Sequence, residues 1–222
     1  MEPWIKPECQ YSYLVIEGNI GAGKTSLVKR LAEDYGAKPV YERFEQNPFL
    51  EKFYQQPERY ALSLEMSFLA DRYDQLKKEV QTRDMFYPFM VADYYLMKSL
   101  IFSRNTLAED EYRLYSHIFN IIHASLPKPD LYVFLHQEVK QLMWNIQTRG
   151  RDYEKAITHE YLESIQEGYF HFFRQQTGIR ILILDTREVD FVHHEEDYRR
   201  LLDTLFRREY PEGVTRCSLR PL

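Results

Sequence analysis

The eight residues Gly-Asn-Ile-Gly-Ala-Gly-Lys-Thr at positions 18–25 constrain this chain more than any other segment. They match the pattern G-x-x-x-x-G-K-[ST], in which backbone N–H groups surround a polyphosphate, the lysine reaches its outer phosphates and the hydroxyl reaches Mg²⁺. The chain has only 8 glycines, and three of them fall within this short stretch. The sequence therefore predicts a phosphate-binding loop made of Gly18, Asn19, Ile20, Gly21, Ala22, Gly23, Lys24 and Thr25.

The rest of the chain predicts how this loop is supported. A mostly apolar run at 11–17 is typical of a buried strand, and 25–35 is an amphipathic helix that stops at Gly36. Further strands are expected at 37–42, 86–92, 131–135 and 179–184, and helices after Asn47 and at 57–82, 94–102, 109–126, 139–148, 158–176 and 195–208. Because strands that alternate with helices pair in parallel, we predict a three-layer α/β fold with a five-stranded parallel sheet flanked by many helices. No linker or repeat divides residues 1–222, so one domain is expected, with 1–10 and 209–222 as tails.

Composition excludes several classes of protein. The chain carries 29 lysines and arginines against 34 aspartates and glutamates, a net charge of −5, so no nucleic-acid partner is expected. No apolar run approaches the ~18 residues of a membrane span, and no membrane partner is expected. Cys9 and Cys217 lie near opposite ends, which argues against a disulfide framework. We therefore expect a soluble, cytoplasmic protein.

A phosphate-binding loop does not specify the reaction, because motors, switches and kinases share it. The switch proteins need an N-K-x-D motif to bind guanine, and the sequence contains none. A motor is normally longer than 222 residues. A small kinase fits best, so the acceptor has to be inferred from the rest of the chain.

Further segments, taken in order, resemble the deoxynucleoside kinases, especially the bacterial purine-type branch. The resemblance runs from about Tyr13 to Leu205. Its pieces are Ile16–Thr25, Glu42, Phe53-Tyr54 followed by Pro57-Glu-Arg59, Glu65 with Arg72, Ala92-Asp93-Tyr94, Arg149-Gly150-Arg151 with Glu154, and Asp190-Phe191. The resemblance implies a P-loop kinase-type fold and ATP- and Mg²⁺-dependent phosphorylation of a deoxynucleoside 5′-hydroxyl in nucleotide salvage, by a homodimer.

The resemblance also implies roles for single residues. Glu42 is expected to be the catalytic base, at the carboxyl end of a strand beside the first strand, where such sheets bind ligands. Glu45 is a competitor in the following loop. Tyr54 and Glu154 would hold the sugar 3′-hydroxyl, and the Tyr54 ring would fill the space that a ribose 2′-hydroxyl needs.

Two arginines and a late loop complete the implied ATP site. Arg149 and Arg151 flank Gly150, which suits a lid whose guanidinium groups stabilise the charge on a transferring phosphoryl group. Asp190-Phe191 resembles the loop that surrounds the adenine of ATP, mostly through backbone contacts.

The chain also departs from the family pattern. Many relatives carry Glu-Arg-Ser at the end of the third strand, where this chain has Ala92-Asp93-Tyr94. Asp93 is the only carboxylate there, so it is expected to bind Mg²⁺ with Thr25 or to contact the 5′-hydroxyl, and both roles stay open. A lid arginine of some relatives aligns with Asn145. The positive charge near the phosphates then comes from Lys24, Arg72, Arg149 and Arg151.

The position expected to contact the base also differs. Glu65, Leu69 and Arg72 lie on one face of the predicted helix at 57–82. Relatives often carry glutamine where this chain has Glu65. An ionised carboxylate only accepts hydrogen bonds, and guanine offers two adjacent donors, whereas adenine and cytosine place an acceptor beside their amino group. This chemistry favours deoxyguanosine, while the resemblance to deoxyadenosine kinases favours deoxyadenosine, so the sequence leaves the purine open.

Two other functions remain as alternatives. A thymidylate-type nucleoside-monophosphate kinase shares the loop but expects Asp-Arg-[Tyr/Ser] after the third strand, where this chain has Asp93-Tyr94-Tyr95. A noncatalytic kinase-like subunit is the second alternative. His193-His194-Glu195-Glu196 is interpreted as the solvated start of a helix and not as a metal site, since consecutive residues rarely converge on one ion.

Overall fold

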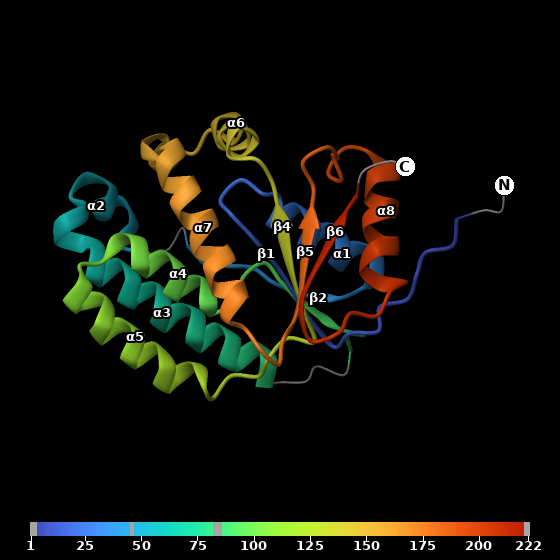
Figure 1. Ribbon diagram of the computed structural model, residues 1–222, viewed down its shortest axis with the longest axis horizontal. Helices are drawn as coiled ribbons and strands as arrows, with labels where there is room; N and C mark the ends of the chain where they lie inside the picture. Colours follow the sequence, from blue (N-terminus) through green and yellow to red (C-terminus); the bar gives the residue numbers. More distant parts are fainter. Residues whose placement is uncertain (1–3, 45–46, 82–85, 220–222) are drawn as a thin grey trace.

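The computed structural model describes residues 4–44, 47–81 and 86–219, and it contains a parallel sheet covered by helices on both faces (Figure 1). The strands, in chain order, are β1 (Tyr13–Gly18), β2 (Lys38–Val40), β3 (Met90–Ala92), β4 (Leu131–His136), β5 (Arg180–Asp185) and β6 (Gly213–Ser218). Their order across the sheet is β2-β3-β1-β4-β5-β6, and each neighbouring pair is parallel. The predicted α/β class is confirmed.

The helices divide between the two faces of the sheet (Figure 1). They are α1 (Lys24–Tyr35), α2 (Leu50–Gln55), α3 (Pro57–Gln81), α4 (Met97–Thr106), α5 (Glu109–His123), α6 (Val139–Arg149), α7 (His159–Gln175) and α8 (Glu195–Phe206), with a 3₁₀ turn at Asp152–Ala156. Helices α1 and α8 cover one face, and α3, α4, α5 and α7 cover the other. No helix in the described ranges is long and apolar enough to cross a membrane.

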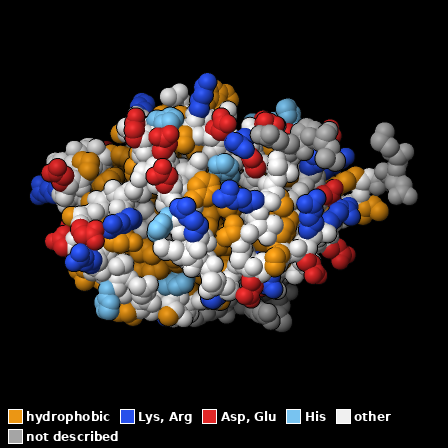
Figure 2. Space-filling view, viewed as in Figure 1, with side chains coloured by type: hydrophobic (Ala, Val, Ile, Leu, Met, Phe, Trp, Pro, Cys, Tyr) orange, Lys and Arg blue, Asp and Glu red, His pale blue; other side chains and the backbone are white. Residues whose placement is uncertain are grey.

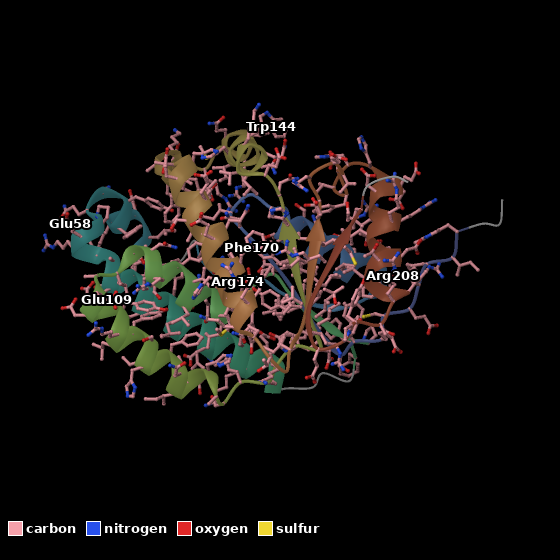
Figure 3. All side chains as sticks on the ribbon, in the orientation of Figure 1. Glu58, Glu109, Trp144, Phe170, Arg174 and Arg208 are labelled. Atoms are coloured by element: carbon pink, nitrogen blue, oxygen red, sulfur yellow. The ribbon has the colours of Figure 1, made fainter. Side chains whose placement is uncertain are left out.

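The alternation of side chains along the strands separates two hydrophobic cores. In β1, Leu14 and Ile16 belong to the core under α1 and α8, whereas Tyr13 and Val15 belong to the core under α3, α4, α5 and α7. Both sets are buried, as expected for a parallel sheet covered on both sides. The second core is rich in aromatic rings. Phe170 of α7, labelled in Figure 3, lies with its ring centroid 5.9 Å from that of Phe134 in β4.

The structure corrects the predicted sheet in three places. A sixth strand, β6, lies within the predicted tail 209–222. The sequence did not reveal it because this edge strand has no fully buried residue: half-buried and exposed positions alternate along it. Strand β2 ends at Val40, and β3 begins at Met90 instead of residue 86. Strand β3 lies between β2 and β1, so the prediction that the strand before Glu42 is the neighbour of β1 is wrong. Glu45, the predicted competitor of Glu42, lies outside the described residues.

Candidate active site

The phosphate-binding loop connects β1 to α1 in a conformation that requires glycine. Gly21 and Gly23 both have a φ of 84°, in the left-handed region that other residues rarely adopt. A Cβ atom on Gly21 would lie 2.8 Å from the Leu142 carbonyl oxygen, and one on Gly23 would lie 3.0 Å from the Phe191 ring. The loop is therefore packed tightly against α6 and the segment before α8, and it ends at the N-terminus of α1, where anions bind favourably.

Lys24 folds back over this loop. Its Nζ donates hydrogen bonds of 2.9 Å to the carbonyl oxygens of Gly18 and Asn19. Burial and the nearby Lys98 ammonium lower the pKa of Lys24 to about 8. Asn145, which aligns with a lid arginine of relatives, donates a 2.8 Å hydrogen bond from Nδ2 to the Gly21 carbonyl oxygen, so it supports the loop from α6.

Asp93 connects the phosphate-binding loop to Glu42. Its Oδ2 accepts a 2.7 Å hydrogen bond from Thr25 Oγ1, and its Oδ1 accepts a 2.8 Å hydrogen bond from the Glu42 backbone N–H. Burial raises the pKa of this carboxyl. In the described part of the chain no group of three or more His, Cys, Asp or Glu is arranged to hold a metal ion. A Mg²⁺ ion fits nevertheless, because it is usually held by one or two protein oxygens together with waters and substrate phosphates.

Glu42 lies two residues beyond β2, and two cations hold its carboxylate. Arg72 of α3 donates to Oε1 from Nε at 2.9 Å and from Nη2 at 2.6 Å. Lys98 of α4 donates to Oε2 at 2.5 Å. Burial alone would raise the pKa of Glu42, but Lys98 and Arg72 outweigh it and lower the pKa to about 2. Glu42 is therefore ionised throughout the physiological range.

Glu65 lies on the same face of α3 as Arg72, seven residues earlier in the chain. It is 3% exposed, and its Oε1 accepts a 2.7 Å hydrogen bond from Thr106 of α4. Its Oε2 has no hydrogen-bond partner among the described residues, although that atom is buried. Burial raises the pKa of Glu65 to about 7 despite the Thr106 hydrogen bond and the charge of Arg72. An unpartnered buried acceptor of this kind is costly and is suited to contact a ligand.

The predicted lid is held by one acidic side chain. Arg149, at the end of α6, donates from Nε at 3.1 Å and from Nη2 at 2.7 Å to Glu154 Oε2, and also from Nη2 to Oε1. Arg151 Nη1 lies 3.6 Å from Glu154 Oε1, and its guanidinium lies over the Phe44 ring. Buried Glu154 therefore holds both arginines together.

The predicted sugar-binding tyrosine lies beside this lid. The Tyr54 ring stacks on that of Tyr153, with the ring centroids 6.3 Å apart. Burial and the Glu154 charge raise the pKa of Tyr54 to about 12, so its hydroxyl stays protonated and is able to donate a hydrogen bond.

One cavity brings nearly all of these side chains together, at the carboxyl ends of the strands, where open α/β sheets bind ligands. The predicted residues that line it are Ile20, Gly21, Lys24, Thr25, Glu42, Tyr54, Glu65, Arg72, Asp93, Arg149, Arg151 and Glu154. The predicted residues that do not line it are Gly18, Asn19, Ala22, Gly23, Asp190 and Phe191. Phe191 packs in the core against Gly23, and Asp190 accepts hydrogen bonds from the Val192 and His193 backbone N–H groups.

Sequence reasoning missed three polar residues of this site. Lys98 and Thr106 lie on α4 and contact Glu42 and Glu65 respectively, and Ser99 accepts a 2.7 Å hydrogen bond from Arg72 Nη1. Lys98 and Thr106 are eight residues apart on α4, and Glu65 and Arg72 are seven residues apart on α3. Polar residues at such helical spacing on two helices are the signal that both helices contribute polar side chains to one cavity.

Comparisons with known proteins show which family the chain belongs to. The family model for deoxynucleoside kinases matches residues 14–208. A deoxyguanosine kinase from Bacillus subtilis (strain 168) is 34% identical over 196 residues, covering 85% of this chain and 93% of that protein. A deoxyadenosine/deoxycytidine kinase from the same organism is 26% identical, covering 87% of this chain and 91% of that protein.

A solved structure shows the same fold. Deoxyadenosine kinase from M. mycoides with bound dATP superimposes with a TM-score of 0.70 at 24% identity, covering 80% of this chain and 92% of that chain. The family model spans most of the chain, and the Bacillus relative matches over nearly its whole length. The chain therefore belongs to the deoxynucleoside kinase family, whose members transfer a phosphoryl group to a deoxynucleoside.

Proposed function

We propose that this enzyme phosphorylates the 5′-hydroxyl of a purine deoxynucleoside, with deoxyguanosine preferred, and that ATP with Mg²⁺ is the donor. The observation that carries the base preference is the buried, unpartnered Oε2 of Glu65 in the cavity. The deoxyguanosine kinase of Bacillus subtilis, 34% identical, supports the same preference.

Base recognition follows from the hydrogen-bonding capacity of Glu65. When ionised, this carboxylate offers acceptors only, and guanine presents two adjacent donors, N1–H and the 2-amino group. Adenine would place its N1 acceptor against one carboxylate oxygen. A hydrogen bond to a charged group contributes about 1.5–3 kcal/mol, so two matched bonds outweigh one matched and one repulsive contact. Thr106, already bonded to Oε1, holds the carboxylate in one orientation.

Phosphoryl transfer is proposed to occur between Glu42 and the phosphate-binding loop. The 5′-oxygen attacks the γ-phosphorus of ATP, and the bond from that phosphorus to the β,γ-bridging oxygen breaks, leaving its electron pair on ADP. The hydroxyl proton passes to the Glu42 carboxylate. Because a carboxylate with a pKa of about 2 is a weak base, the main contribution of Glu42 is to orient the hydroxyl. That is sufficient for a loose transition state, in which positioning and charge stabilisation dominate.

The remaining cavity residues are assigned to charge and to the sugar. Lys24, Arg149 and Arg151 stabilise the negative charge on the phosphates. When bound, Mg²⁺ neutralises part of that charge, and Thr25 and Asp93 would hold it; the Thr25–Asp93 hydrogen bond favours this role of Asp93 over contact with the 5′-hydroxyl.

Tyr54 and Glu154 remain the proposed partners of the 3′-hydroxyl. Asp190 and Phe191 are proposed to reach only the edge of the adenine, since they lie behind the loop and outside the cavity.

A homodimer is also proposed. Helix α5 exposes Leu114 and Ile121, which are 56% and 64% exposed and lie seven residues apart on one face. Figure 2 shows hydrophobic side chains gathered over the part of the surface that α4 and α5 form. The free thiols Cys9 and Cys217 fit the reducing cytoplasm.

A substrate panel tests the proposed function. The enzyme is incubated with ATP, Mg²⁺ and each of four deoxynucleosides, and in parallel with the four deoxynucleoside monophosphates. We expect the monophosphate of deoxyguanosine as the fastest product. Phosphorylation of monophosphates alone would establish the thymidylate-type alternative. No product with any acceptor, and no thermal stabilisation by nucleoside triphosphates, would establish a noncatalytic protein.

A further inference from the structure

Lys98 occupies a position that is unfavourable for a lysine. It lies in the first turn of α4, where the helix dipole opposes positive charge, and it is only 7% exposed. Burying an ammonium group is costly unless it is paired. Residues that break local rules in this way are concentrated at functional sites. The partner of Lys98 is Glu42, and both side chains line the cavity.

The hydrogen bonds of Glu42 differ between its two oxygens. A carboxylate has about two acceptor sites on each oxygen. Oε1 already accepts two hydrogen bonds, both from Arg72, so its capacity is filled. Oε2 accepts one, from Lys98, and therefore keeps one acceptor site for a further donor. The oxygen that is able to take the proton of an acceptor hydroxyl is the one that Lys98 holds.

Tyr94, the residue that follows Asp93, has a structural role. Tyr94 is fully buried, and its hydroxyl donates a 2.9 Å hydrogen bond to Gln75 Oε1 on α3. It helps to join the end of β3 to α3. The positive charge beside Glu42 Oε2 comes from Lys98, four residues further along the chain and in the first turn of α4.

We propose that Lys98 is a positioning residue for phosphoryl transfer: it fixes the rotation of the Glu42 carboxylate so that Oε2 accepts the hydrogen bond of the 5′-hydroxyl. This inference rests on the proposed role of Glu42 as the group that orients that hydroxyl. A hydroxyl bound at Oε2 lies next to the Lys98 ammonium, which then also stabilises negative charge that develops on the 5′-oxygen before the new bond to phosphorus forms. Arg72 holds the other oxygen, Oε1, so both oxygens of the Glu42 carboxylate are fixed.

A double-mutant cycle tests the coupling between the two residues. Turnover is measured for wild type, Lys98→Met, Glu42→Gln and the double variant at saturating ATP and deoxyguanosine. We expect each single change to lower kcat by roughly 10²-fold, since each removes the oriented acceptor. Because Lys98 acts through Glu42, the double variant is expected to be no slower than Glu42→Gln within about twofold, with KM for ATP unchanged within about threefold.

Three controls separate positioning from folding. Lys98→Arg keeps a charged donor and is expected to restore at least about a tenth of wild-type kcat, on a scale where each 1.4 kcal/mol is tenfold. Lys140→Met, at an exposed lysine of α6, is expected to match wild type. Thermal unfolding with and without ATP verifies folding, and Lys98→Gln replaces Lys98→Met in the cycle if the latter does not fold.

The outcomes distinguish the two proposals. Wild-type kcat in Lys98→Met, losses in the cycle that multiply, or a Lys98→Arg variant as slow as Lys98→Met would each overturn the role of Lys98. If Glu42→Gln itself keeps wild-type kcat, the role of Glu42 in the proposed function is the part that fails.

Discussion

Thr25 donates a 2.7 Å hydrogen bond to Asp93, which joins the first turn of α1 to the end of β3. The other oxygen of the same carboxylate accepts the Glu42 backbone N–H. One buried side chain thus sets the distance between the phosphate-binding loop and the residue proposed to orient the acceptor. Phosphoryl transfer depends on that distance, because it is catalysed largely by holding the reacting groups in line.

Asp93→Asn tests the proposed metal site. Asparagine keeps the shape of the side chain but removes its charge, so we expect the Mg²⁺ concentration for half-maximal activity to rise by about 10-fold or more. Thr25→Ser keeps the hydroxyl and is the matched control, with a shift below about threefold. Activity titrated with Mg²⁺ at fixed ATP measures both. An unchanged Mg²⁺ requirement in Asp93→Asn would remove this residue from the metal site.

Lys24→Ala tests the phosphate-binding loop. We expect kcat/KM for ATP to fall by roughly 10²–10³-fold, because a positioned charge on the transferring group is lost. The fold is expected to remain, since burial disfavours the charged form of Lys24 and lowers its pKa to about 8. Steady-state kinetics and thermal unfolding check the two expectations separately. An active variant would show that the loop lysine does not contribute.

Glu65→Gln tests base recognition. The amide offers one donor and one acceptor, the pattern that the N1 atom and 6-amino group of adenine require. We expect the ratio of kcat/KM for deoxyguanosine over deoxyadenosine to fall by about 10-fold or more at pH 8. Leu62→Met, on the same helix, is a control that leaves the carboxylate in place. An unchanged ranking of the four deoxynucleosides would show that Glu65 does not contact the base.

The raised pKa of Glu65 predicts that the base preference depends on pH. Its pKa of about 7 is above its ordinary value, so Glu65 is protonated at lower pH and presents one donor and one acceptor, as adenine requires. Above that pH it is ionised and matches guanine. The deoxyguanosine-to-deoxyadenosine ratio of kcat/KM is therefore expected to rise as pH increases from 6 to 8. The titratable or polar groups that face Glu65 are Arg72, Lys98, Thr106, Tyr115, Tyr161 and Glu42.

The Glu65→Gln variant is the control for this titration, because an amide does not ionise in this range. Its base ratio is expected to be flat between pH 6 and pH 8. A wild-type ratio that is equally flat, or that falls with pH, would contradict the assignment.

The sequence predicted the local elements better than their spatial order. The apolar run of β1 and the glycine-rich loop can be recognised from the sequence alone, because the backbone geometry there depends on a few residue types. The position of β3 between β1 and β2 depends on long-range packing, which no local pattern records. β6 is half-exposed at an edge and carries Arg216 and Thr215 among its few apolar residues, so it resembles a tail.

In the site, too, local patterns were predictable and contacts between distant elements were not. Glu65 and Arg72 are predictable as one face of a helix, and the structure does bury both side chains. The role of Lys98 is not predictable in this way, because it depends on the packing of α4 beside α3, which brings the Lys98 ammonium to Glu42. Asn145 likewise supports the loop through a contact between residues 124 positions apart.

The proposed phosphorylation of deoxyguanosine with the help of Glu42 is tested by one measurement: the initial rate of deoxyguanosine monophosphate formation by wild type and by Glu42→Gln, at saturating ATP, Mg²⁺ and deoxyguanosine. We expect rapid formation by wild type and a rate lower by roughly 10²-fold in the variant, with ATP still raising the unfolding temperature of both proteins. Equal rates in the two proteins, or no product from wild type, would contradict that proposal.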